Sequence, residues 1–185
     1  MRTFFTIALS VVLTSALQAQ NLNPNWKKEL AAALEQFQAC SAGEQNSGCS
    51  KIQGEVLSTV YKINDFYAQK SGRYMTVSEV SAFLKGNDSW TPLGPVYLQE
   101  TLTKAQELAN DKKAVVAVYQ NAAAMGHVAL IIPGDLEPSG SWGLNVPNTA
   151  SFFLPEPDKS FVNKGLSFAF TKNMMKDIVL YVRTY

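Results

Sequence analysis

Residues 126–134 read Gly-His-Val-Ala-Leu-Ile-Ile-Pro-Gly. An apolar, β-branched run that ends at Pro-Gly is typical of a buried strand followed by a turn. The run begins at His127, the single histidine of the chain. The segment therefore predicts a strand of a sheet. Because an imidazole titrates near neutral pH, His127 also makes acid–base chemistry available at the start of this strand.

Strand-like composition continues through the C-terminal half of the chain. Gly, Pro, Asn and Asp separate the segments, and no long helical crossover lies between them, so we expect a largely antiparallel five-stranded sheet. The predicted strands are 114–119, 127–132, 144–153, 166–170 and 178–183.

The N-terminal half is predicted to be helical, with helices over 27–39, 48–68, 76–86 and 97–110. Thr76 and Glu79 have the spacing of a capping box, and Gly86 is a natural stop. Residues 87–95 are predicted to be a loop. Helices followed by a meandering sheet indicate an α+β domain.

The first 19 residues resemble a secretory signal peptide. Arg2 is followed by a short apolar run, and small residues precede Gln20. We therefore expect residues 1–19 to be removed and residues 20–185 to form one exported domain, periplasmic or extracellular. No later segment is apolar enough over a sufficient length to span a bilayer, so no stable membrane insertion is expected.

Net charge gives little indication of a polyanionic partner. The chain carries 16 basic and 15 acidic residues. Without Arg2 the two signs balance, and no basic stripe is visible, so a nucleic-acid partner is not expected. We expect a monomer.

Cys49 is the second residue with evident chemical potential. Its helix is predicted to start near Ser47, and a helix N-terminus favours a thiolate. The spacing of Cys49 from Ile52 and Val56 places the thiol on the apolar, inward-facing side of the helix. A thiolate close to the His127 imidazole would form the nucleophile–base pair of a cysteine hydrolase.

A competing interpretation uses the same thiol. Cys40 and Cys49 can form a disulfide across the polar segment 41–48, as exported proteins commonly do. Such a bond would stabilise the fold and remove the nucleophile. Both interpretations remain open from the residues alone.

Several blocks together resemble the NlpC-like branch of papain-fold cysteine peptidases and amidases, which act on bacterial cell-wall peptides. The resemblance covers about residues 49–183, with the cysteine before the histidine. The blocks are 48–52, 109–110, 115–118, 126–134, 141–143, 146–147, 166–170 and 181–183.

This resemblance implies a papain-like, NlpC-type fold with Cys49 as nucleophile and His127 as general base. The third residue, which orients the imidazole, is expected to be Asn148, with Ser151 as the alternative. These two differ in strand parity, so at most one should face the imidazole. Trp142 and Trp90, with Ser151, are candidate substrate-binding residues.

The implied reaction is hydrolysis of an amide bond, expected in the stem peptides of peptidoglycan. No cofactor is implied, and one histidine with two cysteines makes a poor metal site. The alternative function is a non-catalytic secreted binding module with a Cys40–Cys49 disulfide.

Overall fold

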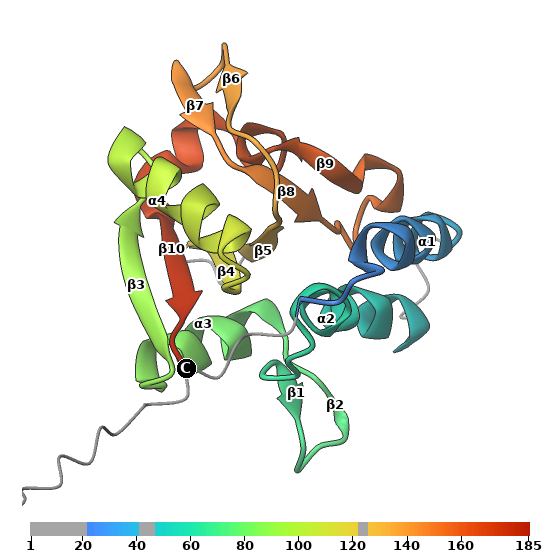
Figure 1. Cartoon of the computed structure of the whole chain (residues 1–185). Coiled ribbons are helices and arrows are strands. Elements are labelled where there is room, and N and C mark those ends of the chain that lie inside the picture. The colour runs from blue at the N-terminus through green and yellow to red at the C-terminus, as the bar shows by residue number, and fades with distance from the viewer. Residues whose placement is uncertain (1–21, 41–46, 122–125) are drawn as a thin grey trace, which may run out of the picture.

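The computed structural model describes residues 22–40, 47–121 and 126–185. The predicted signal peptide, residues 1–19, lies outside the described residues. Four α-helices occur in the described part, and α1 and α2 run side by side (Figure 1). Their bounds are α1 Trp26–Gln38, α2 Ser47–Tyr61, α3 Val77–Gly86 and α4 Gln99–Asn110.

The central element is an antiparallel sheet in the order β3-β10-β4-β5-β8-β9. Two small hairpins are separate from it: β6-β7 extends beyond one end of the sheet, and β1-β2, between α2 and α3 in the chain, projects below α2 (Figure 1). The strands are β1 Tyr67–Ala68, β2 Arg73–Tyr74, β3 Trp90–Pro95, β4 Val115–Gln120, β5 Gly126–Ile131, β6 Glu137–Ser139, β7 Leu144–Val146, β8 Asn148–Ser151, β9 Phe161–Gly165 and β10 Ile178–Arg183.

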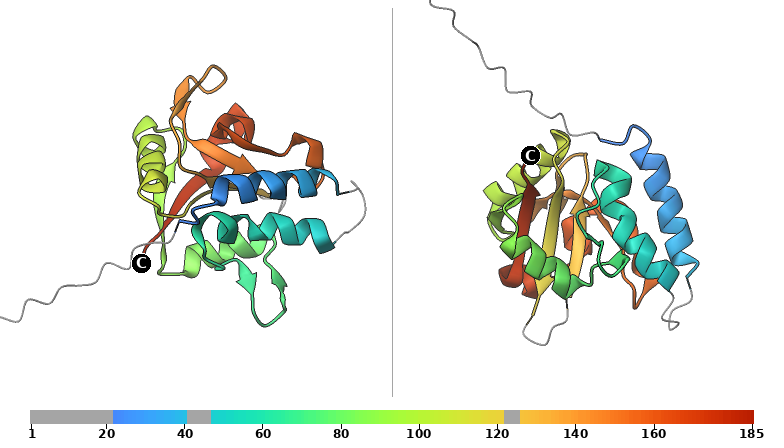
Figure 2. Two further views of the ribbon diagram at one scale, coloured as in Figure 1. Left: turned by 45° about the vertical axis from the view of Figure 1, so that its right-hand side comes forward. Right: turned by 90° about the horizontal axis from the view of Figure 1, so that it is seen from below.

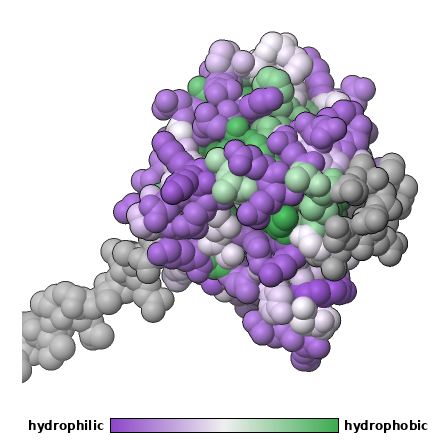
Figure 3. Space-filling view, turned by 90° about the vertical axis from the view of Figure 1, so that its right-hand side faces the viewer, coloured by the Kyte–Doolittle hydropathy of each residue, from purple (hydrophilic) through white to green (hydrophobic). Residues whose placement is uncertain are grey.

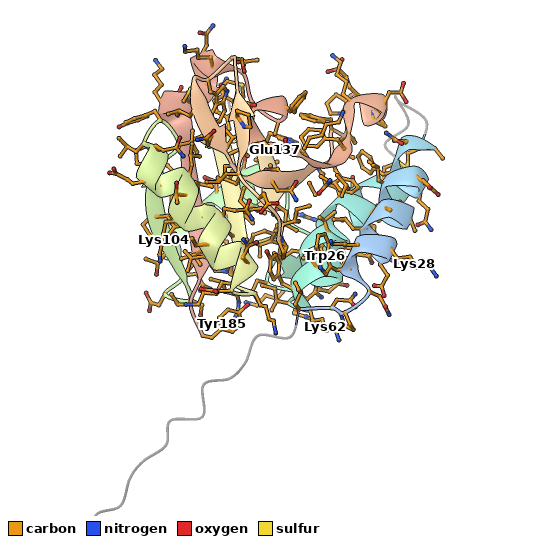
Figure 4. The ribbon with its side chains drawn as sticks, turned by 45° about the horizontal axis from the view of Figure 1, so that its top comes forward. Trp26, Lys28, Lys62, Lys104, Glu137 and Tyr185 are labelled. Carbon is orange, nitrogen blue, oxygen red and sulfur yellow. A yellow bond between two sulfur atoms is a disulfide. The ribbon has the colours of Figure 1, made fainter. Side chains whose placement is uncertain are left out.

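Helices cover both faces of this sheet, so the fold has three layers (Figure 2). Alternate residues of each strand point to opposite faces. Val116, Leu130 and Ala150 pack with residues of α1, α2 and α3 in one apolar cluster. Val115, Ala129 and Ile131 pack with residues of α4 in a second cluster on the other face. On α1, Trp26 points into the molecule and Lys28 points out of it (Figure 4).

The α+β class and the antiparallel sheet are confirmed, but the sheet has six strands and not the expected five. Residues 90–95 form the edge strand β3, not a loop, and pair with β10. The predicted strand 144–153 is two strands, because Pro147 lacks the N–H needed to continue a ladder. Residues 166–168 form a 3₁₀ turn after the unpredicted strand β9.

Two predictions about the helices have different outcomes. The capping box at α3 is confirmed: Glu79 N–H donates to Thr76 Oγ1 (3.3 Å) and Thr76 N–H donates to Glu79 Oε2 (2.7 Å). Helix α2 ends at Tyr61, seven residues earlier than predicted. Lys62 there has φ 52°, a left-handed conformation that stops a helix. No helix within the described ranges is long and apolar enough to cross a bilayer.

Candidate functional site

His127 lies near the start of β5, opposite Tyr119 of β4. Its ring stacks on Phe153, with centroids 4.3 Å apart, and meets the edge of Phe170 at 5.5 Å. Its Nε2 lies 2.6 Å from Ser151 Oγ. The imidazole is therefore held between two aromatic rings and a hydroxyl.

Burial controls the charge of this imidazole. It lowers the pKa of His127 to about 4, because the charged form loses its hydration among the rings. At neutral pH the ring is therefore uncharged.

Cys49 lies in the first turn of α2 and is 5% exposed. The prediction that its side chain faces inward is confirmed, since it packs in the same apolar cluster as Phe37 and Val60. Its sulfur is bonded to that of Cys40, which follows the end of α1. The thiol is thereby consumed as a nucleophile.

The sheet separates Cys49 from His127. Val128 and Leu130 point to the face of β5 opposite that of His127, and they pack in the cluster that contains Cys49. The His127 ring instead contacts Phe170, which belongs to the cluster on the α4 face. Contrary to the sequence-based expectation, the structure does not bring the two predicted catalytic residues together.

Asn148 and Ser151 lie differently relative to the imidazole, as their opposite parity along β8 predicts. Ser151 is the residue that meets the imidazole. Asn148 Nδ2 donates instead to the carbonyl of Pro133 (3.2 Å) and to Asn163 Oδ1 (2.9 Å). Asn148 therefore ties the end of β5 to β9, and the preference for it as the orienting residue is corrected.

Neither predicted substrate-binding tryptophan has a free face. Trp90 is 3% exposed and donates its indole N–H to Asp65 (2.9 Å) while stacking on Phe66. Trp142 is 4% exposed and donates to the Phe170 carbonyl (3.2 Å). Ser151, the third candidate, is also buried, at 1% exposure. These side chains act as core residues in this fold.

A different feature has the form of a ligand site: a cleft of about 880 Å³ between α2, α3 and the sheet. This volume is within the range of small-molecule sites. In Figure 2 (right), α2 and α3 lie on the same face of the sheet and the strands run behind them. The hairpin β1-β2 borders the same cleft.

Apolar side chains dominate the walls of the cleft. The sheet contributes a floor in which Val116, Leu130 and Ala150 are cross-strand partners. Phe152 and Val128 continue that floor. Hydrophobic residues also reach the surface between hydrophilic ones on the face that carries α1 and α2 (Figure 3).

Charged groups occur at the cleft in pairs. Lys51 Nζ lies 3.6 Å from Glu55. Arg73 donates two bonds of 2.8 Å to the two carboxylate oxygens of Glu79. This contact holds the pKa of Glu79 at about 2, so the pair stays ionised at neutral pH. Among the described residues no group of three potential metal ligands occurs.

An interpretation of the sequence based on reactive residues does not predict this cleft, because its walls are mostly aliphatic and aromatic. One signal was nevertheless present in the sequence. Ser71-Gly72 lies between Tyr67 and Tyr74, as expected for a short hairpin, and Gly72 has φ 64°. The helix expected over 48–68 instead includes β1, the first strand of this hairpin.

Comparison with known proteins adds no relative: no protein-family model matches the chain, and no curated protein matches it either. The resemblance to the NlpC-like family therefore rests on the sequence blocks alone.

Proposed function

We propose that this chain is an exported binding protein, stabilised by the Cys40–Cys49 disulfide, whose ligand occupies the cleft between α2 and α3. The observation that carries the proposal is the placement of Cys49. Its sulfur is bonded to Cys40, and the one imidazole of the chain lies on the opposite face of the sheet. A thiolate–imidazole pair is therefore not assembled.

Two features support an extracytoplasmic location. Residues 1–19 have the pattern of a secretory signal peptide. A disulfide between α1 and α2 also suits an oxidising compartment such as the periplasm or the cell exterior.

A cysteine hydrolase acting on peptidoglycan is the competing function. It would require reduction of the Cys40–Cys49 bond and a rearrangement that carries His127 across the sheet. Phe153 and Phe170 pack against the imidazole and oppose such a movement.

Digestion of purified peptidoglycan tests the two functions against each other. Wild type and Cys49→Ala are incubated with peptidoglycan, with and without a thiol reductant, and the soluble fragments are analysed by mass spectrometry. We expect no muropeptide release by either protein, while a known cell-wall hydrolase digests the same sample. Release by wild type and not by Cys49→Ala would establish the hydrolase.

Alkylation of the unreduced protein under denaturing conditions supplies the matching thiol count. We expect no alkylated cysteine in protein isolated from an exporting host. Two alkylated cysteines would contradict the disulfide on which the proposal depends.

A further inference from the structure

The floor of the cleft is a continuous apolar strip that crosses three strands. Val116 pairs with Leu130, and Leu130 pairs with Ala150, so their side chains form one row. Neighbouring strands lie about 4.8 Å apart, so the row from β4 to β8 spans roughly 10 Å. Val128 and Phe152 lie beside this row and lengthen the strip. Its shape suits an extended chain.

The walls of the cleft, like its floor, are lined by apolar side chains. Val56 and Leu57 contribute from α2, and Val80 contributes from α3. Leu154, 38% exposed, also lines the cleft and supplies apolar surface in contact with solvent. A ligand that fills the cleft therefore buries hydrocarbon on several sides, which is the main source of affinity in such sites.

The charges at the cleft disfavour an ionic ligand. Of the described residues that line it, three are charged: Lys51, Glu55 and Arg73. Lys51 pairs with Glu55, and Arg73 is held by both oxygens of Glu79. The two pairs balance in charge, so a carboxylate or phosphate headgroup would have to compete with Glu79 for Arg73 or with Glu55 for Lys51.

Besides Arg73, the hairpin provides two polar side chains that carry no charge. Tyr67 and Tyr74 line the cleft, and their rings meet edge to face with centroids 5.1 Å apart. Tyrosine presents an apolar ring and a hydroxyl, a combination that suits the junction between a hydrocarbon chain and a polar headgroup.

We propose that the cleft binds an uncharged amphiphile with a single hydrocarbon chain, such as a long-chain alcohol. This inference rests on the proposed binding function and adds the class of ligand. The chain lies along the strip formed by Val116, Leu130 and Ala150. The uncharged polar end lies at the hairpin, beside Tyr67 and Tyr74.

Displacement of a neutral fluorescent probe tests the ligand class. The oxidised mature protein is loaded with N-phenyl-1-naphthylamine, which is then displaced by decanol, dodecanol, tetradecanol or dodecanoate below their aggregation limits. We expect the affinity of the alcohols to rise by roughly fourfold per added methylene. Dodecanoate should bind about tenfold more weakly than dodecanol, because its carboxylate loses hydration and must compete with Glu55 and Glu79 for the basic side chains of the cleft.

Variants locate the site. Val128→Trp places a large ring in the floor of the cleft and should reduce probe binding by about tenfold. Thr91→Trp, at an exposed position of the edge strand β3, is the matched control and should bind as wild type. If Val128→Trp does not fold, Leu154→Glu adds a charge at an exposed position of the cleft and should weaken dodecanol binding.

The outcomes separate this inference from the proposed function. Dodecanoate binding as tightly as dodecanol, or an affinity independent of chain length, would overturn the ligand class and leave a binding protein. Full binding by both Val128→Trp and Leu154→Glu would overturn the location. Muropeptide release in the peptidoglycan digestion would overturn the proposed function itself.

Discussion

His127 shows how the environment of a residue decides its chemistry. As the single imidazole of the chain, it was the natural candidate for a general base. In the structure it is stacked on Phe153 and hydrogen-bonded to Ser151. Burial against the rings lowers its pKa to about 4, so it is uncharged at neutral pH.

This pKa predicts a pH-dependent stability. The folded-state pKa of about 4 lies below the value of roughly 6.5 for an unfolded chain. The unfolded state therefore binds the proton more readily, and stability present above pH 6.5 is lost as the pH falls toward 4. Between pH 7 and pH 5 the contribution of His127 to the free energy of unfolding should fall by roughly 1–2 kcal/mol.

Urea unfolding of wild type and His127→Gln at both pH values checks this prediction. The difference in unfolding free energy between pH 7 and pH 5 should be smaller in the variant. An unchanged difference would show that His127 is not the titrating group.

Asp65 is a second residue whose role is specific. Its carboxylate accepts from the Trp90 indole (2.9 Å) and from Arg183 Nε (2.6 Å), so it joins the segment before β1 to β3 and β10. Asp65→Ala leaves two partly buried donors without this partner and should lower stability by roughly 2–3 kcal/mol.

Thermal and urea unfolding measure that loss. Lys104→Ala is the control, because its pair with Glu107 is 59% exposed on both sides and should contribute less than about 0.5 kcal/mol. Equal effects of the two substitutions would contradict the structural role of Asp65.

At the scale of elements, the disulfide ties the end of α1 to the start of α2. It joins cysteines nine positions apart, and Cys49 is buried in the cluster beneath both helices. Replacing both cysteines by alanine should lower the free energy of unfolding by roughly 2–3 kcal/mol, since the unfolded chain regains the freedom of the closed loop. Urea unfolding of the double variant measures this change, and a loss below about 0.5 kcal/mol would contradict it.

The contact between α2 and the hairpin depends on Gly54. A Cβ at this position would clash with Cβ and Cγ of Tyr74, at the base of a rigid ring, so α2 or β2 must shift. Gly54→Ala should therefore cost about 1–3 kcal/mol and alter probe binding in the cleft. At Gly86, within α3, an added Cβ would have nothing within 4 Å, so Gly86→Ala should leave probe binding unchanged and should not lower stability.

The sequence predicted elements where the local signals were strong and independent of tertiary contacts. Examples are the capping box of α3, the strand 178–183 and the position of Cys49 on the inward-facing side of its helix. The errors lie where distant contacts decide. Trp90–Pro95 contains two prolines yet forms a strand, because β10 supplies its pairing partner at the sheet edge.

In the whole molecule, the packing of the helices decides which helix each strand residue meets. Strand parity places His127 and Val128 on opposite faces, but parity alone cannot tell which face α2 covers. The structure places α2 over Val128 and Leu130 and α4 over Ala129 and Ile131. The same strand that suggested a catalytic histidine thus supplies the floor of the cleft.

An amide-resolved NMR titration of the oxidised protein with dodecanol tests whether the ligand occupies the cleft between α2 and α3. Binding in the cleft should shift the amide signals of Val116, Val128 and Leu130 together with those of Gly54 and Val80, and leave the signals around Trp142 unchanged. Shifts confined to the surroundings of His127 and Trp142, on the α4 face, would contradict this account.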